Sequence, residues 1–185
     1  PDSVNRKGFR SWETGHIPLS PLQQFLGNDM MNGKEKKRNY GGFFIMTSVT
    51  SALIKVFESS GFECELVETE KEDQVRIPIT GDTFGPRLMV VRFPHEGDYM
   101  AVFLPDLLEI PKGKASTALK VANELHRSSH LVKFWVDKKN RSLWAMINTF
   151  IEEETAVDTA VKAVGLLVDY CNRMCPVFES AMNEG

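Results

Sequence analysis

The sequence predicts an α+β fold in which a largely antiparallel sheet of five or six strands has helices packed on one face. Two observations lead to this prediction. Turn-like segments at 94–98 and 138–141 each separate two stretches of strand character, which is typical of β-hairpins. Three other stretches space their apolar residues as a helix does, and the last of them is the longest. The expected order is helix, four strands, helix, two strands, helix.

The first expected helix comes from the apolar spacing of residues 49–57. Thr47 or Ser48 can cap its start, and Gly61 can end it. Residues 62–66 then alternate apolar with acidic side chains, which predicts a strand with one face in water, followed by a charged turn at 68–73.

Three more strands are expected before the second helix. Residues 75–79 form the first of them, and Pro78 indicates a sheet edge or a strand end, because proline has no N–H for the ladder. Residues 88–93 and 99–104 form a hairpin around the turn-like segment 94–98. Residues 105–113 are expected to be a connection without regular structure.

The second half of the chain reads as a helix, a hairpin and a long final helix. The helix is expected at 115–125 and the two strands at 131–136 and 143–150. The final helix carries an apolar stripe over 157–175, and Thr155 with Asp158 predicts a capping box at its start. Pro176 is expected to kink or end this helix.

Residues 1–45 differ in character from residues 46–185. The first segment carries seven Lys/Arg and four Asp/Glu, a net charge of +3, whereas the second carries a net charge of −6. The first segment also lacks a sustained period, so we expect a poorly ordered or leader-like N-terminal extension before a single domain at 46–185. Gly41 and Gly42 shortly before Met46 could be encoded by a ribosome-binding sequence, which suggests the hypothesis that Met46 is the natural start.

Composition excludes several classes of protein. Three cysteines in 185 residues are too few for a disulfide framework and indicate a reducing compartment, so we expect a cytoplasmic protein. No run approaches the ~20 apolar residues of a membrane helix, so no membrane association is expected. The net charge of −3 gives no general attraction to nucleic acid.

The element order and apolar pattern resemble the YbjN-like family, which shares the type III secretion chaperone-like fold. The resemblance covers about residues 47–183 and lies in the helix ending at Gly61-Phe62, the hairpin around 95–98, the helix at 115–127, the hairpin at 132–150 and the long helix after it. Six expected strands depart from the usual five of that fold. The resemblance implies a dimer-prone, non-enzymatic protein of chaperone-like or regulatory type, and it brings no catalytic residues.

Motifs for catalysis, cofactors or metals are incomplete. Residues 27–34 imitate a phosphate loop but have five residues between the glycines instead of four, and Glu35 stands where a Ser or Thr would hold magnesium. Cys171 and Cys175 share a core-facing helical stripe and are expected to be buried structural residues. His126 and His130 lack a zinc-protease pattern and are expected to be helix-end histidines. We therefore expect no enzyme activity, no cofactor and no metal.

The hairpin at 132–150 gives the sharpest hypothesis about a binding site. A four-residue loop at 138–141 pairs residues whose numbers sum to 279, so Trp135 faces Trp144 and Lys133 faces Met146 on one side of the sheet. With helices on the other side only, these four residues would form an exposed apolar patch that binds a partner. The alternative is that the N-terminal segment or another helix covers them.

Together these observations predict a non-enzymatic module that binds a protein or peptide partner and forms a homodimer, with the partner docking on the open sheet face or on a sheet edge. Two alternatives stay open. One is a small-molecule-binding protein or enzyme whose pocket is built from residues distant in sequence. The other is a nucleic-acid binder using the basic tract at 34–38, but no nucleic acid is expected because the tract is short and contains Glu35.

Overall fold

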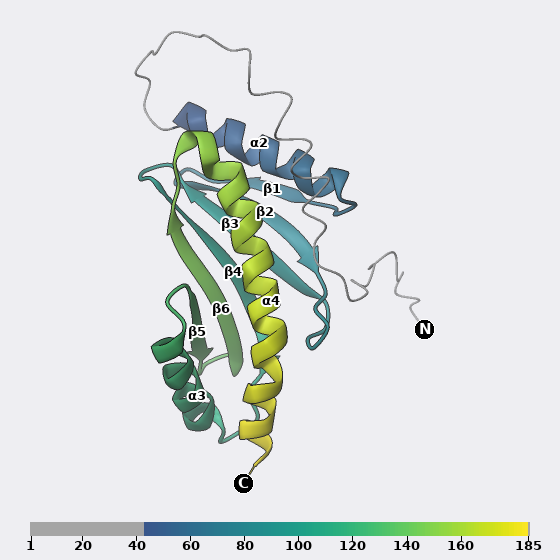
Figure 1. Cartoon of the computed structure of the whole chain (residues 1–185), viewed down its shortest axis with the longest axis vertical. Coiled ribbons are helices and arrows are strands. Elements are labelled where there is room, and N and C mark those ends of the chain that lie inside the picture. Colours follow the sequence, from purple (N-terminus) through teal and green to yellow (C-terminus); the bar gives the residue numbers. More distant parts are fainter. Residues whose placement is uncertain (1–42, 185) are drawn as a thin grey trace.

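The structure, a computed structural model, describes residues 43–184 of the chain (Figure 1). The N-terminal segment 1–45 therefore lies almost entirely outside the described residues, as do the glycine pattern at 27–34 and the basic tract at 34–38. The first described helix, α2, already begins at Phe43, three residues before the predicted domain boundary.

The predicted α+β fold and its element order are confirmed. The elements are α2 (Phe43–Ser59), β1 (Glu65–Glu68), β2 (Glu72–Ile79), β3 (Arg87–Pro94), β4 (Tyr99–Glu109), α3 (Ala115–Ser128), β5 (Val132–Asp137), β6 (Ser142–Phe150), a 3-10 turn (Glu153–Thr155) and α4 (Ala156–Asn183). The six strands form one sheet in the order β1-β2-β3-β4-β6-β5, and every neighbouring pair is antiparallel.

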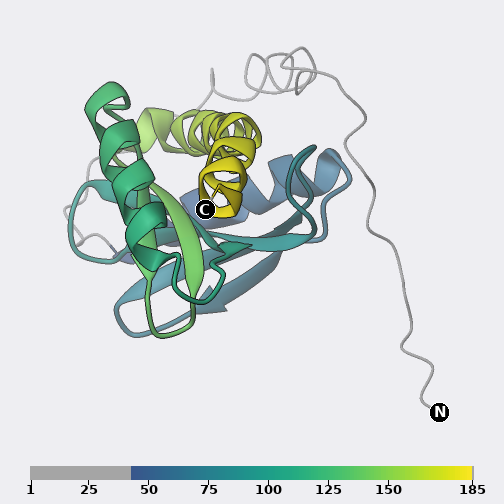
Figure 2. The same ribbon diagram turned by 90° about the horizontal axis from the view of Figure 1, so that it is seen from below.

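The three helices lie on one face of the sheet, and α4 runs across its centre (Figures 1 and 2). Strand alternation explains this arrangement, because every second residue of the central strands is apolar and points under the helices. Examples on β2 are Val75, Ile77 and Ile79, all buried. Helix α2 packs over β2, whereas the predicted stripe of α4 packs over β4 and β6 and buries Leu167, among others. The core therefore lies between the sheet and these helices.

The end of α2 explains why the strand predicted at 62–66 starts later, at Glu65. The Phe62 N–H donates to the Phe57 carbonyl at 3.0 Å and the Gly61 N–H to the Glu58 carbonyl at 2.9 Å, which is a Schellman cap. Gly61 has φ of +87°, which glycine adopts without strain. The rings of Phe57 and Phe62 pack edge-on with centroids 5.8 Å apart, so Phe62 belongs to the helix cap.

Strand β4 continues through the segment predicted to be an irregular connection. Its pairing with β6 shifts between Leu104 and Leu108, which identifies a β-bulge, and Asp106 there has φ of +50°. Leu107 and Leu108 are buried, so burial carries the strand past Pro105. The connection is therefore limited to residues 110–114.

Pro176 was expected to kink or end the last helix, but α4 continues to Asn183. A proline leaves the carbonyl four residues earlier, that of Asn172, without its helical donor. Here the Thr83 hydroxyl donates to that carbonyl at 2.8 Å. The Asn172 side-chain Oδ1 in turn accepts the backbone N–H of Asp82 at 2.8 Å and of Thr83 at 3.3 Å. The loop after β2 thus replaces the missing helical bond and lets the helix continue.

The predicted capping box of α4 does not form. Thr155 makes no side-chain bond to the helix start, and its hydroxyl donates back to the Glu152 carbonyl at 3.5 Å. The reason is that the 3-10 turn Glu153–Thr155 leads directly into α4, so the Thr155 backbone is already helical.

Candidate functional site

The side of the sheet opposite the helices, which we call the open face, has no described helix on it (Figure 2). Its side chains are those that alternate with the buried ones along each strand. Several large apolar residues of this face are exposed: Leu88, Tyr99, Trp135 and Phe150. Such residues on a face without a described helix are typical of an interaction surface.

The predicted pairing of the β5–β6 hairpin is confirmed in full. Trp135 lies opposite Trp144 and Lys133 opposite Met146, on the open face. The two indole rings stack, with centroids 5.9 Å apart and an angle of 17° between their planes. Trp135 is 51% exposed, whereas Trp144 is half-buried and its Nε1–H donates to the Ser142 hydroxyl at 3.0 Å. We call Trp135, Trp144, Met146 and Lys133 the tryptophan patch.

Strand order extends the tryptophan patch across the sheet with residues that the sequence analysis missed. Met146 on β6 lies opposite Phe103 on β4, which lies opposite Val90 on β3. The Arg92 guanidinium lies 5.2 Å from the centre of the Phe103 ring. Alternation could have placed Phe103 on the open face, but only the tertiary structure puts β4 beside β6 and so puts Phe103 beside Met146.

The charged side chains of the open face described below are bonded to other groups of the same chain. The Arg92 guanidinium bonds both carboxylate oxygens of Glu72, with Nε at 2.8 and 2.9 Å. Arg76 forms an ion pair with Glu65 at 3.4 Å. The Lys133 ammonium donates to the Ser129 carbonyl at 3.0 Å. A partner could therefore cover this face without supplying charges of its own.

Both edges of the sheet are poorly suited to adding another strand. At one edge, β1 has four residues and begins and ends with a glutamate. At the other edge, two N–H groups of β5 are occupied at the end of α3. The Val132 N–H donates to the hydroxyl of the C-cap residue Ser129 at 3.1 Å, and the Phe134 N–H donates to His126 Nε2 at 2.8 Å. Short, charged or covered edge strands resist pairing with other chains. The open face is thus the better candidate for a binding surface.

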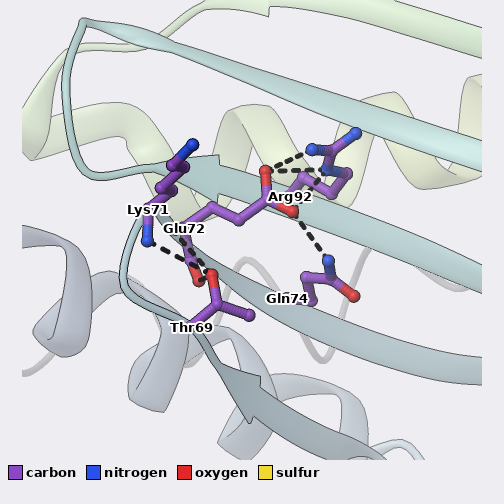
Figure 3. Close-up of polar contacts among 5 residues, drawn as sticks. All are labelled: Thr69, Lys71, Glu72, Gln74 and Arg92. Carbon is purple, nitrogen blue, oxygen red and sulfur yellow. Dashed lines mark hydrogen bonds and ion pairs between the residues drawn. The ribbon is translucent and has the colours of Figure 1, made fainter.

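A shallow depression of about 420 Å³ lies at the turn between β1 and β2. Figure 3 shows the polar contacts of Glu72 at this place. It is lined by Thr69, Glu70, Lys71, Glu72 and Arg92. The Glu72 carboxylate accepts hydrogen bonds from Arg92 and Gln74, which outweigh burial and lower its pKa. A carboxylate held charged by two partners is a poor proton donor or acceptor. Glu72 is therefore poorly suited to act as a general acid or base.

His95 and Asp73 form a buried pair at the same end of the sheet. His95 Nε2 lies 2.9 Å from Asp73 Oδ1, and His95 Nδ1 lies 3.3 Å from the Glu70 carbonyl oxygen. Both neighbours accept hydrogen bonds, so both ring nitrogens are best satisfied when protonated. The bond to Asp73 raises the pKa of His95 despite burial. The pair ties the end of β3 to the start of β2 and has a structural role.

The remaining candidates for chemistry are placed as expected. Cys171 and Cys175 are buried in the core, where burial raises the pKa of the Cys175 thiol to about 12 and that of Cys171 well above its usual value. His126 lies in the last turn of α3, as predicted, and His130 follows the helix end. Within residues 43–184, no three His, Cys, Asp or Glu side chains gather as a metal site requires. None of the helices in that range combines the length and apolar character needed to cross a membrane.

Comparison of the chain with models of protein families, with curated proteins and with solved structures found no match.

Proposed function

We propose that this chain is a non-enzymatic, protein-binding module of YbjN-like, chaperone-like or regulatory type, and that its open face binds a second copy of the chain. The observation that carries the proposal is the stacked, half-exposed tryptophan pair on a face without a described helix. Three free cysteines, two of them buried in the core, agree with a reducing compartment such as the cytoplasm.

The size of the open face supports a homodimer. Six strands about 4.8 Å apart, with 4 to 11 residues each at about 3.3 Å per residue, present roughly 700 Å² in projection. Two such faces together give roughly 1,400 Å², which is within the range of standard stable interfaces. A homodimer of moderate affinity is therefore within reach of this face alone.

The chemistry of the face also favours a second copy. Its two arginines are paired with glutamates and Lys133 donates to a backbone carbonyl, so the complementary surface should be apolar and aromatic with few unpaired charges. The same face on another copy has these properties, and a twofold axis would bring the two patches together. Both sheet edges resist pairing with another strand, so face-to-face packing of two sheets is the favoured geometry.

The test is the mass of the full chain in solution by light scattering over a range of concentrations. We expect a dimer that W135S/W144S converts to a monomer. Val177→Ser is a matched control, because Val177 is 44% exposed on α4, on the opposite side of the sheet. If the double variant fails to fold, as circular dichroism would show, Trp135→Lys alone places a charge on the patch. A wild-type monomer, or a dimer that both patch variants leave intact, would contradict the proposal.

A further inference from the structure

Helix α3 holds edge strand β5 through contacts at its C-terminal end. Two of them use Ser129, whose hydroxyl accepts the Val132 N–H and whose carbonyl accepts the Lys133 ammonium. The third is the bond from the Phe134 N–H to His126 Nε2 at 2.8 Å. This third contact differs from the others, because an imidazole nitrogen accepts a hydrogen bond only while it carries no proton.

The surroundings of His126 favour the neutral ring. Burial lowers the pKa of His126, and the neighbouring Lys133 ammonium on β5 lowers it further. The charged neighbours of His126 along its own helix are Glu124 and Arg127, which are of opposite sign. The imidazole is therefore an acceptor at neutral pH, and acid converts it into a donor that opposes the Phe134 N–H.

Helix α4 also packs against this strand. The Phe134 ring stacks on Tyr170 at 6.0 Å, and Arg173 lies 5.3 Å from the centre of the Tyr170 ring. Arg173 forms an ion pair with Asp169 at 2.9 Å. Protonation of His126 therefore acts mainly on its bond to the Phe134 N–H.

That bond lies one residue from the tryptophan patch. Along β5 the side chains alternate, so Phe134 points into the core while Lys133 and Trp135 belong to the open face. β5 is an edge strand with β6 as its strand neighbour, and α3 supports its other side. Loss of the His126 bond leaves the Phe134 N–H unsatisfied and loosens the strand that carries half of the stacked pair.

We infer that His126 is a proton-operated latch that couples α3 to the tryptophan patch, so that acid loosens β5 and weakens self-association through the open face. The inference rests on the proposed function for its effect on association, while the latch itself is a property of the single chain. It assigns to His126 a positioning role, with no contact to the partner.

The latch is tested by NMR on the full chain labelled with ¹⁵N, between about pH 5 and 7.5, where histidines titrate. We expect the Phe134 amide and the Trp135 indole signals to shift together, at a pH below the usual histidine value. His126→Gln keeps an acceptor that does not titrate and should abolish both shifts. His130→Asn is the matched control and should keep them. A Trp135 signal that does not follow pH, or that still does so in H126Q, would overturn the latch.

Association is tested separately by light scattering over the same pH range. The dimer dissociation constant should rise several-fold on acidification in wild type and in H130N but stay constant in H126Q. A dimer lost in W135S/W144S but insensitive to pH would support the proposed function and overturn the coupling. A wild-type monomer at every pH would reject the proposed function and with it the coupling to association. The NMR signals would still decide whether the latch exists.

Discussion

The hydrogen bond from the Thr83 hydroxyl to the Asn172 carbonyl should stabilise the fold more than it would if residue 176 had a backbone N–H, because Pro176 cannot donate to that carbonyl. Thr83→Val removes this donor while keeping the shape of the side chain. A neutral hydrogen bond contributes about 0.5–1.5 kcal/mol net, and Thr83 is exposed enough for water to replace part of it. We therefore expect T83V to lower the free energy of unfolding by about 0.5–1 kcal/mol.

A second substitution separates this bond from other effects of losing the hydroxyl. Pro176→Ala restores a backbone N–H that can donate to the Asn172 carbonyl along the helix. In the P176A background that carbonyl has a partner, so T83V should cost less than about half of its effect in wild type.

The assay is urea unfolding of wild type, T83V, P176A and the double variant at one protein concentration, monitored by far-UV circular dichroism. We expect a coupling free energy of a few tenths of a kcal/mol or more between positions 83 and 176. Additive effects would show that the Thr83 hydroxyl does not act as the substitute donor for the proline, and that α4 passes Pro176 for another reason.

Two further predictions concern the same framework. Asp73 raises the pKa of His95 in the folded protein. The stability that this pair contributes is therefore full below about pH 6.5, the pKa of an unfolded histidine, and is lost as pH rises through the pKa of the folded protein. His95→Gln should flatten this part of the pH dependence of the urea midpoint, and an unchanged pH dependence would contradict the role of the pair. Gly81→Ala should lower the free energy of unfolding by about 1–3 kcal/mol, because a Cβ there would lie 2.2 Å from the Phe84 ring and 2.5 Å from Asn172 Oδ1. A urea midpoint equal to that of wild type would show that the loop moves freely.

Local sequence patterns predicted the β5–β6 hairpin well, for a physical reason. The side-chain period of a strand is two, and the loop length sets which residues face each other, so the pairing of Trp135 with Trp144 follows from the sequence alone. Prediction was weaker where a local signal has two outcomes. Residues 105–113 suggested a connection, but burial of Leu107 and Leu108 carries the strand on to Glu109. Pro176 suggested a kink or a helix end, but the Thr83 hydroxyl supplies the missing donor and α4 continues.

The binding surface was only partly predictable. Sequence alternation identified the four residues of the tryptophan patch, but their neighbour Phe103 comes from β4, over forty residues earlier than Met146. Two partly buried histidines show the same limit. His126 and His95 have similar intrinsic chemistry, yet one accepts from a backbone N–H and the other is placed between two acceptors. Their opposite pKa directions come from these neighbours and burial.

The sequence by itself therefore determined the α+β class, the order of the elements and the facing residues of the last hairpin, because periodicity and turn residues act over a few positions. Only the tertiary structure decided the strand order β1-β2-β3-β4-β6-β5, the exposure of the open face and the contacts of His126, Asp73 and Asn172. These depend on how distant segments pack against one another, and that is settled by burial and hydrogen bonding summed over the whole domain.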